Sequence, residues 1–146
     1  MNTITTDILI IGAGPAGLVA AATANANYPE KQITIIKEFE KAQVPCGIPY
    51  VFGKTLGDVE KNAMPCGGPV ANITTIVDKV LSVDIKTKTA TASQHAITFE
   101  KLIFATGSIP FVHDNFVDSV ALPNVFVIEK SYDEVKRLQE YIKDKK

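Results

Sequence analysis

Three glycines near the amino terminus stand at the spacing of a phosphate-binding turn. Gly12, Gly14 and Gly17 directly follow a run of aliphatic residues and open an alanine-rich segment. In a strand–turn–helix unit the first glycine permits the turn, the second lets backbone approach a pyrophosphate, and the third lets the helix pack on the strand. A glycine turn without a ligand is the alternative. We predict an adenine-nucleotide phosphate site formed by Gly12, Gly14, Pro15, Ala16 and Gly17.

A carboxylate at the end of the second strand of such a unit normally binds ribose hydroxyls. Here the expected strand ends in Ile36-Lys37-Glu38, and Glu38 is the nearby carboxylate in suitable register. Two alternatives stay open, because Lys37 can occupy the usual position and Glu38 can be a solvated surface residue. We keep Glu38 as the candidate ribose ligand.

A cysteine lies between two prolines shortly after this unit, in Val-Pro-Cys46-Gly-Ile-Pro-Tyr. A thiolate there is a candidate nucleophile or redox group, favoured where helix amides stabilise its charge. The alternative is a buried structural cysteine. Residues 47–61 contain no second cysteine, which disfavours a two-cysteine mechanism. Cys66 lies too far along the chain to form a local pair, so we interpret it as incidental, with a resolving thiol as the alternative.

A second turn sequence, Ala105-Thr106-Gly107, closes an apolar segment and precedes Ser-Ile-Pro. Its glycine lets backbone approach a ligand, and Thr106 offers a hydroxyl and an amide. A plain turn at the end of a strand would use the same residues. Ala105, Thr106 and Gly107 are therefore further candidate nucleotide contacts.

These groups need a fold that brings strand ends together, and the hydrophobic pattern predicts an α/β fold. Residues 7–11 and 32–36 form the continuous apolar runs of buried parallel strands, and residues 15–26 favour a helix. In this order they make a right-handed β-α-β unit. Three β-branched stretches then predict a small antiparallel meander, at residues 73–77, 80–85 and 89–92.

The last third of the chain predicts two more strands and a helix. Residues 101–106 and 125–128 are short apolar runs. Ser131 followed by Glu134 matches a capping box, and apolar residues recur at helical spacing as far as Ile142.

Composition excludes several classes of function. The 146 residues, 46% hydrophobic and 21% charged, fit one soluble domain. A net charge of -1 offers no basic surface to nucleic acid. His95 and His113 have no carboxylate or cysteine at ligand spacing, so we predict no metal site and interpret both as surface histidines.

The uncharged stretch 8–27 is long enough to raise the question of a membrane helix. Glycines and a proline interrupt it near its middle, which favours a soluble strand, turn and helix. Two cysteines are too few for a disulfide scaffold, and the first residues lack the basic flank of a secretory leader. We expect a cytoplasmic protein without membrane contact.

The motifs together resemble those of the pyridine nucleotide-disulfide oxidoreductases. The loop from Cys46 to Tyr50 is similar to the Cys-Gly-Leu-Pro-Tyr loop of the single-cysteine branch, which contains coenzyme A-disulfide reductase and NADH oxidase type enzymes. Ile48 replaces the leucine. Residues 105–110 match the family's Ala-Thr-Gly-Ser-x-Pro segment.

The resemblance implies a three-layer, Rossmann-like FAD-binding domain with a parallel sheet, helices and the meander. It further implies that Cys46 lies against the flavin as the catalytic thiol and that Val80 contacts adenine through its backbone. Electrons would pass from NAD(P)H through FAD to Cys46. The acceptor would be a small-molecule disulfide, a persulfide or an oxygen species.

The resemblance also implies that this chain is incomplete. We expect residues 1–112 to form the amino-terminal part of the FAD-binding domain and residues 113–146 a linker strand and helix. Family members continue with a nicotinamide-binding fold, a returning Gly-Asp segment and a dimerisation domain. We therefore expect weak or absent FAD binding, no turnover by this chain alone, and self-association through exposed apolar surface. A stand-alone adenine-nucleotide-binding module is the alternative.

Overall fold

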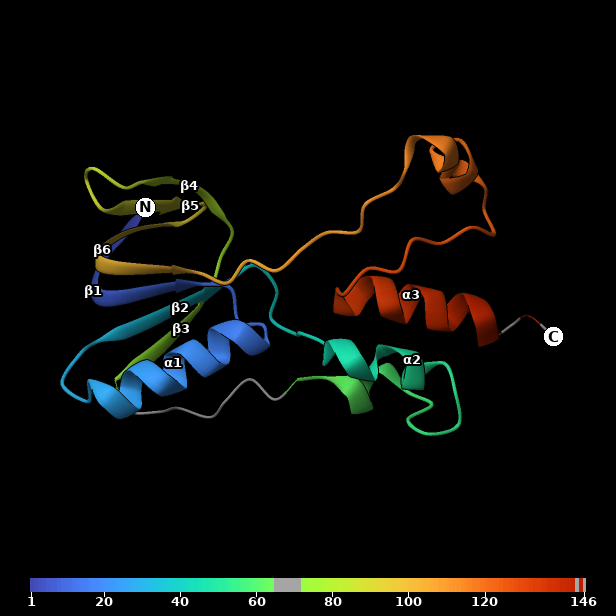
Figure 1. Cartoon of the computed structure of the whole chain (residues 1–146), viewed down its shortest axis with the longest axis horizontal. Coiled ribbons are helices and arrows are strands. Elements are labelled where there is room, and N and C mark those ends of the chain that lie inside the picture. The colour runs from blue at the N-terminus through green and yellow to red at the C-terminus, as the bar shows by residue number, and fades with distance from the viewer. Residues whose placement is uncertain (65–71, 144, 146) are drawn as a thin grey trace. The chain divides into compact units, whose positions relative to one another are not determined.

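A computed structural model describes residues 1–64, 72–143 and 145, and they form two compact units (Figure 1). The sheet unit contains residues 1–40 and 72–107. The cysteine unit contains residues 41–64 and 108–143. The units alternate along the chain, and the predicted boundary after residue 112 stays a prediction.

The sheet unit holds one mixed sheet of six strands in the order β3-β2-β1-β6-β5-β4. The first four strands of this order are parallel to one another, and β5 and β4 continue antiparallel to β6. The bounds are β1 Asn2–Ile11, β2 Ile33–Lys37, β3 Ile73–Val77, β4 Val80–Asp84, β5 Thr89–Ala92 and β6 His95–Phe104. The prediction of a Rossmann-like α/β fold is confirmed.

Two details of the predicted topology were wrong. Residues 73–77 do not join the meander, because β3 pairs in parallel with β2 from Ile33↔Ile73 to Lys37↔Val77. The meander consists instead of β4, β5 and the first part of β6. The strand expected at 101–106 is the second half of this longer strand. β-branched residues suit both kinds of pairing, so composition alone did not distinguish them.

Alternation along the parallel strands divides the core between two faces. Helix α1 (Pro15–Asn27) covers one face, where Ala21 and Ala24 pack with Ile10 and neighbouring residues of β2. The other face is covered by the meander, and its buried cluster contains Leu9, Ile11, Ile36, Ala90, Ala92, Ile97 and Phe99. Helix, parallel strands and meander thus form three layers.

Hydrogen bonds link both ends of β1 to the carboxyl-terminal end of β2, the end of β1 directly and its start through Gln94 and Asp78. The Gly12 N–H, just after β1, donates to the Ile36 carbonyl at 2.8 Å. A straight strand of 10 residues spans roughly 33 Å, too long for its first residue to reach the same place. β1 is therefore bent. The hydrogen bonds that bring its start there run from Asn2 N–H to Gln94 O (2.8 Å), Gln94 N–H to Asp78 Oδ2 (2.9 Å) and Asp78 N–H to Lys37 O (2.9 Å).

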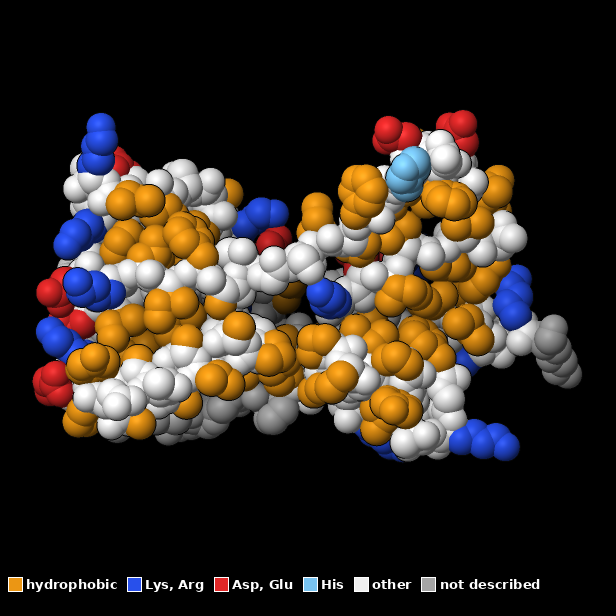
Figure 2. Space-filling view, in the orientation of Figure 1, with side chains coloured by type: hydrophobic (Ala, Val, Ile, Leu, Met, Phe, Trp, Pro, Cys, Tyr) orange, Lys and Arg blue, Asp and Glu red, His pale blue; other side chains and the backbone are white. Residues whose placement is uncertain are grey.

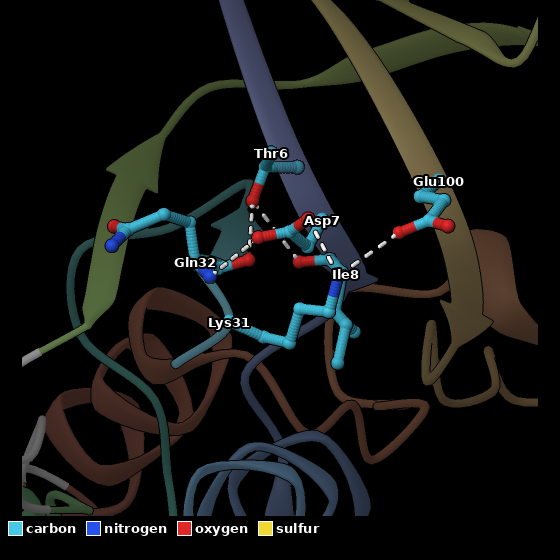
Figure 3. Close-up of polar contacts among 6 residues, drawn as sticks. All are labelled: Thr6, Asp7, Ile8, Lys31, Gln32 and Glu100. Carbon is cyan, nitrogen blue, oxygen red and sulfur yellow. Dashed lines mark hydrogen bonds and ion pairs between the residues drawn. The ribbon is translucent and has the colours of Figure 1, made fainter. Parts of the chain in front are cut away.

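Lys31 forms ion pairs with two neighbouring strands near the middle of β1 (Figure 3). Its ammonium lies 3.3 Å from the Asp7 carboxylate on β1 and 3.4 Å from the Glu100 carboxylate on β6. The parallel pairing of β1 with β6 goes from Thr6↔Phe99 to Ile8↔Lys101, so Asp7 and Glu100 are not part of it. The Gln32 N–H donates to Asp7 Oδ2 at 2.8 Å, and the Thr6 hydroxyl donates to the Gln32 carbonyl at 2.9 Å. Hydrogen bonds from the Gln32 backbone and from Lys31 lower the pKa of Asp7.

The cysteine unit is built from short helices around a small apolar cluster. Its helices are the 3₁₀ turns η1 Pro45–Gly47, η2 Val59–Asn62, η3 Asp114–Phe116 and η4 Ser119–Ala121, and the α-helices α2 Ile48–Val51 and α3 Tyr132–Lys143. Ile48, Val51, Val59, Tyr132 and Val135 form the buried cluster.

Helix α3 confirms the predicted terminal helix. The Ser131 hydroxyl oxygen accepts a hydrogen bond from the Glu134 N–H at 3.3 Å, as the capping signal indicated. The strand expected at residues 125–128 is absent from this described segment. Its apolar side chains do pack locally, since Phe126 stacks at 4.7 Å on Tyr141 of α3, but its backbone has no strand to pair with.

Candidate functional site

Two of the three predicted glycines are required by close backbone contacts. Gly12 has φ +109°, and a Cβ there would lie 2.1 Å from the Ala105 carbonyl oxygen. A Cβ at Gly17 would lie 1.9 Å from the Gly12 carbonyl oxygen. The Ala105 N–H donates to the Ile11 carbonyl at 2.8 Å. The structure thus brings together two motifs that stand far apart in the sequence.

Gly14 is different, because a Cβ there would meet nothing within 4 Å. It caps α1, whose first position is proline and whose first turn has neither a side-chain cap nor an acidic residue. The first four N–H groups of a helix have no partner within the helix, so the Ala16 and Gly17 amides are available at this end. The open space in front of Gly14 fits an anion bound by amides and helix dipole.

The turn after β6 adds a second backbone surface beside the first. Gly107 has φ +76°, and its Cβ position is also open. Thr106 is exposed, and Ala105 is half-buried against the glycine turn. Ala105, Thr106 and Gly107 therefore border the same carboxyl edge of the sheet as Gly12.

The end of β2 presents Glu38 rather than Lys37. Lys37 is buried, and its ammonium donates to the Glu40 carbonyl at 2.7 Å. Glu38 is exposed and pairs with the ammonium of Lys79 at 2.9 Å. Lys79, which sequence reasoning missed, precedes Val80. Val80 is half-buried and packs on the meander cluster.

One buried carboxylate was also missed. Asp78 is 7% exposed and accepts hydrogen bonds from the Gln94 N–H (2.9 Å) and the Lys79 N–H (2.8 Å). His95 Nδ1 lies 2.8 Å from Asp78 Oδ2, and this contact, followed by the backbone donors, lowers the pKa of Asp78. The interpretation of His95 as a surface histidine was therefore wrong. The meander brings the two residues together, because Val80 pairs with Ala92 and the Ser93 N–H donates to the Lys79 carbonyl at 3.0 Å.

Cys46 lies in the cysteine unit, in the turn η1, as an exposed free thiol. The alternative of a buried structural cysteine is thereby excluded. The following helix α2 is only four residues long, and we attribute no special stabilisation of a thiolate to its amides. Cys66 lies outside the described residues.

Neither a metal site nor a membrane-spanning helix is found among the described residues. Within the described ranges, no group of three or more histidine, cysteine, aspartate or glutamate residues could hold a metal ion. No helix in the same part of the chain is long and apolar enough to cross a bilayer.

Comparison with known proteins identifies the family. The sequence profile of the pyridine nucleotide-disulphide oxidoreductases matches residues 6–146. The chain belongs to this family. No curated protein sequence gives a significant match.

Solved structures of oxidoreductases share the fold. The chain is similar to the reduced CoADR-RHD of Bacillus anthracis (19% identity, TM-score 0.78, 99% of this chain and 28% of that one). It is also similar to the water-forming NADH oxidase of Lactobacillus brevis bound to NADH (20%, 0.76, 95% and 32%). A third is the NAD-dependent persulfide reductase of A. fulgidus (19%, 0.77, 95% and 28%). The chain spans about a third of the length of these proteins.

Members of the pyridine nucleotide-disulphide oxidoreductase family are FAD-dependent flavoproteins. The glycine turn fits the pyrophosphate of such a cofactor on two grounds. The space at Gly14 is open, and the neighbouring helix end has amides but no competing carboxylate. The sheet unit contains all the predicted nucleotide-binding residues: Gly12, Gly14, Pro15, Ala16, Gly17, Glu38, Val80, Ala105, Thr106 and Gly107.

Proposed function

We propose that this chain is the amino-terminal, FAD-binding part of an FAD-dependent pyridine nucleotide-disulfide oxidoreductase with a single redox cysteine. The observation that carries the proposal is the open space at Gly14 in front of a bare helix end. Gly12 and Gly17 are glycines because backbone lies against them, whereas none of the described residues gives Gly14 such a reason. A pyrophosphate approaching the backbone supplies one.

Each predicted residue has a distinct task in this proposal. The Ala16 and Gly17 amides bind the pyrophosphate, and the Ala105–Gly107 turn borders it. Glu38 accepts hydrogen bonds from ribose hydroxyls, while Lys79 holds its carboxylate at 2.9 Å. Val80 offers backbone to adenine. Bound FAD would carry two electrons from NAD(P)H to the thiol site.

Cys46 is proposed as the catalytic thiol because it is exposed and free within its turn. As a thiolate it attacks one sulfur of a disulfide, forms a mixed disulfide and releases the other half as a thiolate. Two electrons then return Cys46 to the thiolate and release the second thiol. A persulfide substrate or an oxygen species is the alternative acceptor in this proposal. A peroxide would oxidise the thiolate to a sulfenic acid and release hydroxide, and two electrons with a proton would return the sulfenic acid to the thiolate and release water.

Turnover by this chain alone is not expected. Hydride transfer needs a nicotinamide held against the flavin, and none of the proposed residues binds one. Large exposed apolar side chains (Figure 2), among them Ile109 at 91% and Phe111 at 85%, support self-association of the isolated chain. An adenine-nucleotide-binding module without chemistry stays the second candidate, favoured by the location of the glycine turn within one compact unit.

Calorimetry with ADP and with FAD tests the nucleotide site. Gly14→Val places bulk in the open space and should lower ADP affinity about tenfold or more, a loss of about 1.4 kcal/mol. Gly53→Val is the matched control, because Gly53 is a similarly uncrowded glycine in the other unit. Unchanged ADP binding by Gly14→Val would show that the nucleotide site lies elsewhere.

The visible spectrum and an assay of NADH oxidation with added FAD test the expected inactivity. A yellow protein with steady NADH oxidation dependent on Cys46 would contradict that expectation.

A further inference from the structure

Three amide side chains are buried in the cysteine unit. Gln43, Asn62 and Gln139 are 2%, 3% and 7% exposed. Burying an amide is costly unless its polar atoms are hydrogen-bonded. In the described structure every buried side-chain nitrogen and oxygen has a partner. The bonds that these amides make therefore specify the arrangement of the unit.

Asn62 holds the turn that carries Cys46 from one side. The Val44 N–H donates to the backbone carbonyl of Asn62 at 3.0 Å, and the side-chain Nδ2 of Asn62 donates to the Val44 carbonyl at 3.1 Å. Nδ2 also donates to Gln43 Oε1 at 2.7 Å. The same Val44 carbonyl accepts the Gly47 N–H at 2.9 Å, which closes the turn around Cys46.

The oxygen of the same amide packs against the other side of the turn. A Cβ at Gly47 would lie 1.8 Å from Asn62 Oδ1. Gly47 has φ -85° and ψ -17°, which any residue can adopt. Its identity therefore follows from the Asn62 side chain and not from backbone strain.

We propose that Asn62 is the positioning residue for Cys46, acting through Val44 and Gly47 on either side of the thiol. The proposal rests on the proposed thiol role of Cys46. Its hydrogen bonds fix the residue two positions before the cysteine, and its oxygen excludes a side chain at the residue after it. The exposed thiol thus lies on a turn that the buried Asn62 side chain contacts twice, by a hydrogen bond at Val44 and by close packing at Gly47.

The test measures the alkylation rate of Cys46 by iodoacetamide as a function of pH in the full 146-residue chain. Peptide mass spectrometry separates Cys46 from Cys66. Asn62→Ala should move the profile towards that of the chain unfolded in urea, with a rate change of about threefold or more near neutral pH. Asn27→Ala is the matched control, because Asn27 lies in the sheet unit and its exposed amide donates to the Thr23 carbonyl within the same helix. Its profile should equal that of the wild type.

A second pair of variants keeps the test decisive if Asn62→Ala does not fold. Gly47→Ala should alter the Cys46 profile, because its Cβ meets the asparagine oxygen. Gly47→Ala combined with Asn62→Ser removes the colliding atom, keeps a hydroxyl donor, and should return the profile towards wild type. A Gly47→Ala chain with a wild-type profile would overturn the inference.

The baseline separates the two proposals. If the wild-type profile already matches that of the urea-unfolded chain, the fold does not tune Cys46, and its proposed redox role fails together with the inference. If the wild-type profile is distinct and Asn62→Ala leaves it unchanged, only the positioning role of Asn62 fails.

Discussion

The sheet unit and the cysteine unit achieve order by different means. In the sheet unit, strand ladders satisfy the backbone, and two large apolar clusters fill the faces of the sheet. The cysteine unit has short helices, one cluster of five buried residues and a set of buried amides. Hydrophobic burial is tolerant of detail, whereas a buried amide needs particular partners at particular distances. We therefore expect the two units to respond differently to small substitutions.

The largest effect is expected where backbone meets backbone in the sheet unit. Gly17→Ala puts a Cβ 1.9 Å from the Gly12 carbonyl oxygen, so the helix must move away from the turn. We expect a loss of about 3 kcal/mol of unfolding free energy. Gly14→Ala is the control and should change stability by less than about 1 kcal/mol. Urea denaturation measures both, and similar losses for the two variants would contradict the close packing at Gly17.

A smaller effect should follow from removing one buried amide of the cysteine unit. Gln139 accepts the Val59 N–H (3.2 Å) and donates to the carbonyls of Val51 (3.2 Å) and Gly57 (3.0 Å). Gln139→Leu keeps the volume and leaves these groups without that partner, so we expect a loss of about 2 kcal/mol. Gln94→Leu, at an exposed position, is the control. Hydrogen exchange should show the loss in the cysteine unit and leave the sheet protected.

The smallest effect should be a change in acid sensitivity. The His95 contact and the backbone donors lower the pKa of Asp78 on folding. Its stabilising contribution is therefore complete above the pKa that Asp78 has in the unfolded chain, and it is lost as pH falls from there through the lower pKa of the folded state. Asp78→Asn should remove this part of the acid dependence below about pH 4. Thermal unfolding between pH 3 and pH 6 measures it. An unchanged acid limb in Asp78→Asn would show that other carboxylates dominate.

Much of the sheet unit could be predicted from the sequence. The apolar runs, the glycine spacing and the helix signals depend on neighbours a few residues apart, and they located β1, α1, β2 and the turn motifs. The place of β3 could not be predicted in this way, because pairing with β2 depends on contacts across the inserted residues 41–64. The Asp78–His95 pair was missed because it depends on how β4, β5 and β6 pair with one another, which the residues next to Asp78 and His95 in the sequence do not indicate.

The thiol site shows the limit most clearly. Its motif identified Cys46 and Gly47, but nothing local indicated that Asn62 explains the glycine. The amide reaches the turn from 15 or more residues away, and a lone asparagine in a polar segment carries no pattern. The expected strand at 125–128 failed through the opposite error, since an apolar run forms a strand only where another strand offers an edge.

The bent β1 has a consequence for the newly synthesised chain. Of the six described strands, β1 is synthesised before the other five and lies inside the sheet, yet β6, which pairs with it from Asn2 to Ile11, is synthesised after them all. Its two halves must stay unpaired on that side while the intervening residues emerge. The exposed ladder of an aliphatic strand attracts other chains during this interval. Asp7 lies in the middle of β1, and Lys31 lies two residues before β2. Their charges oppose such pairing until the folded chain brings them together as an ion pair.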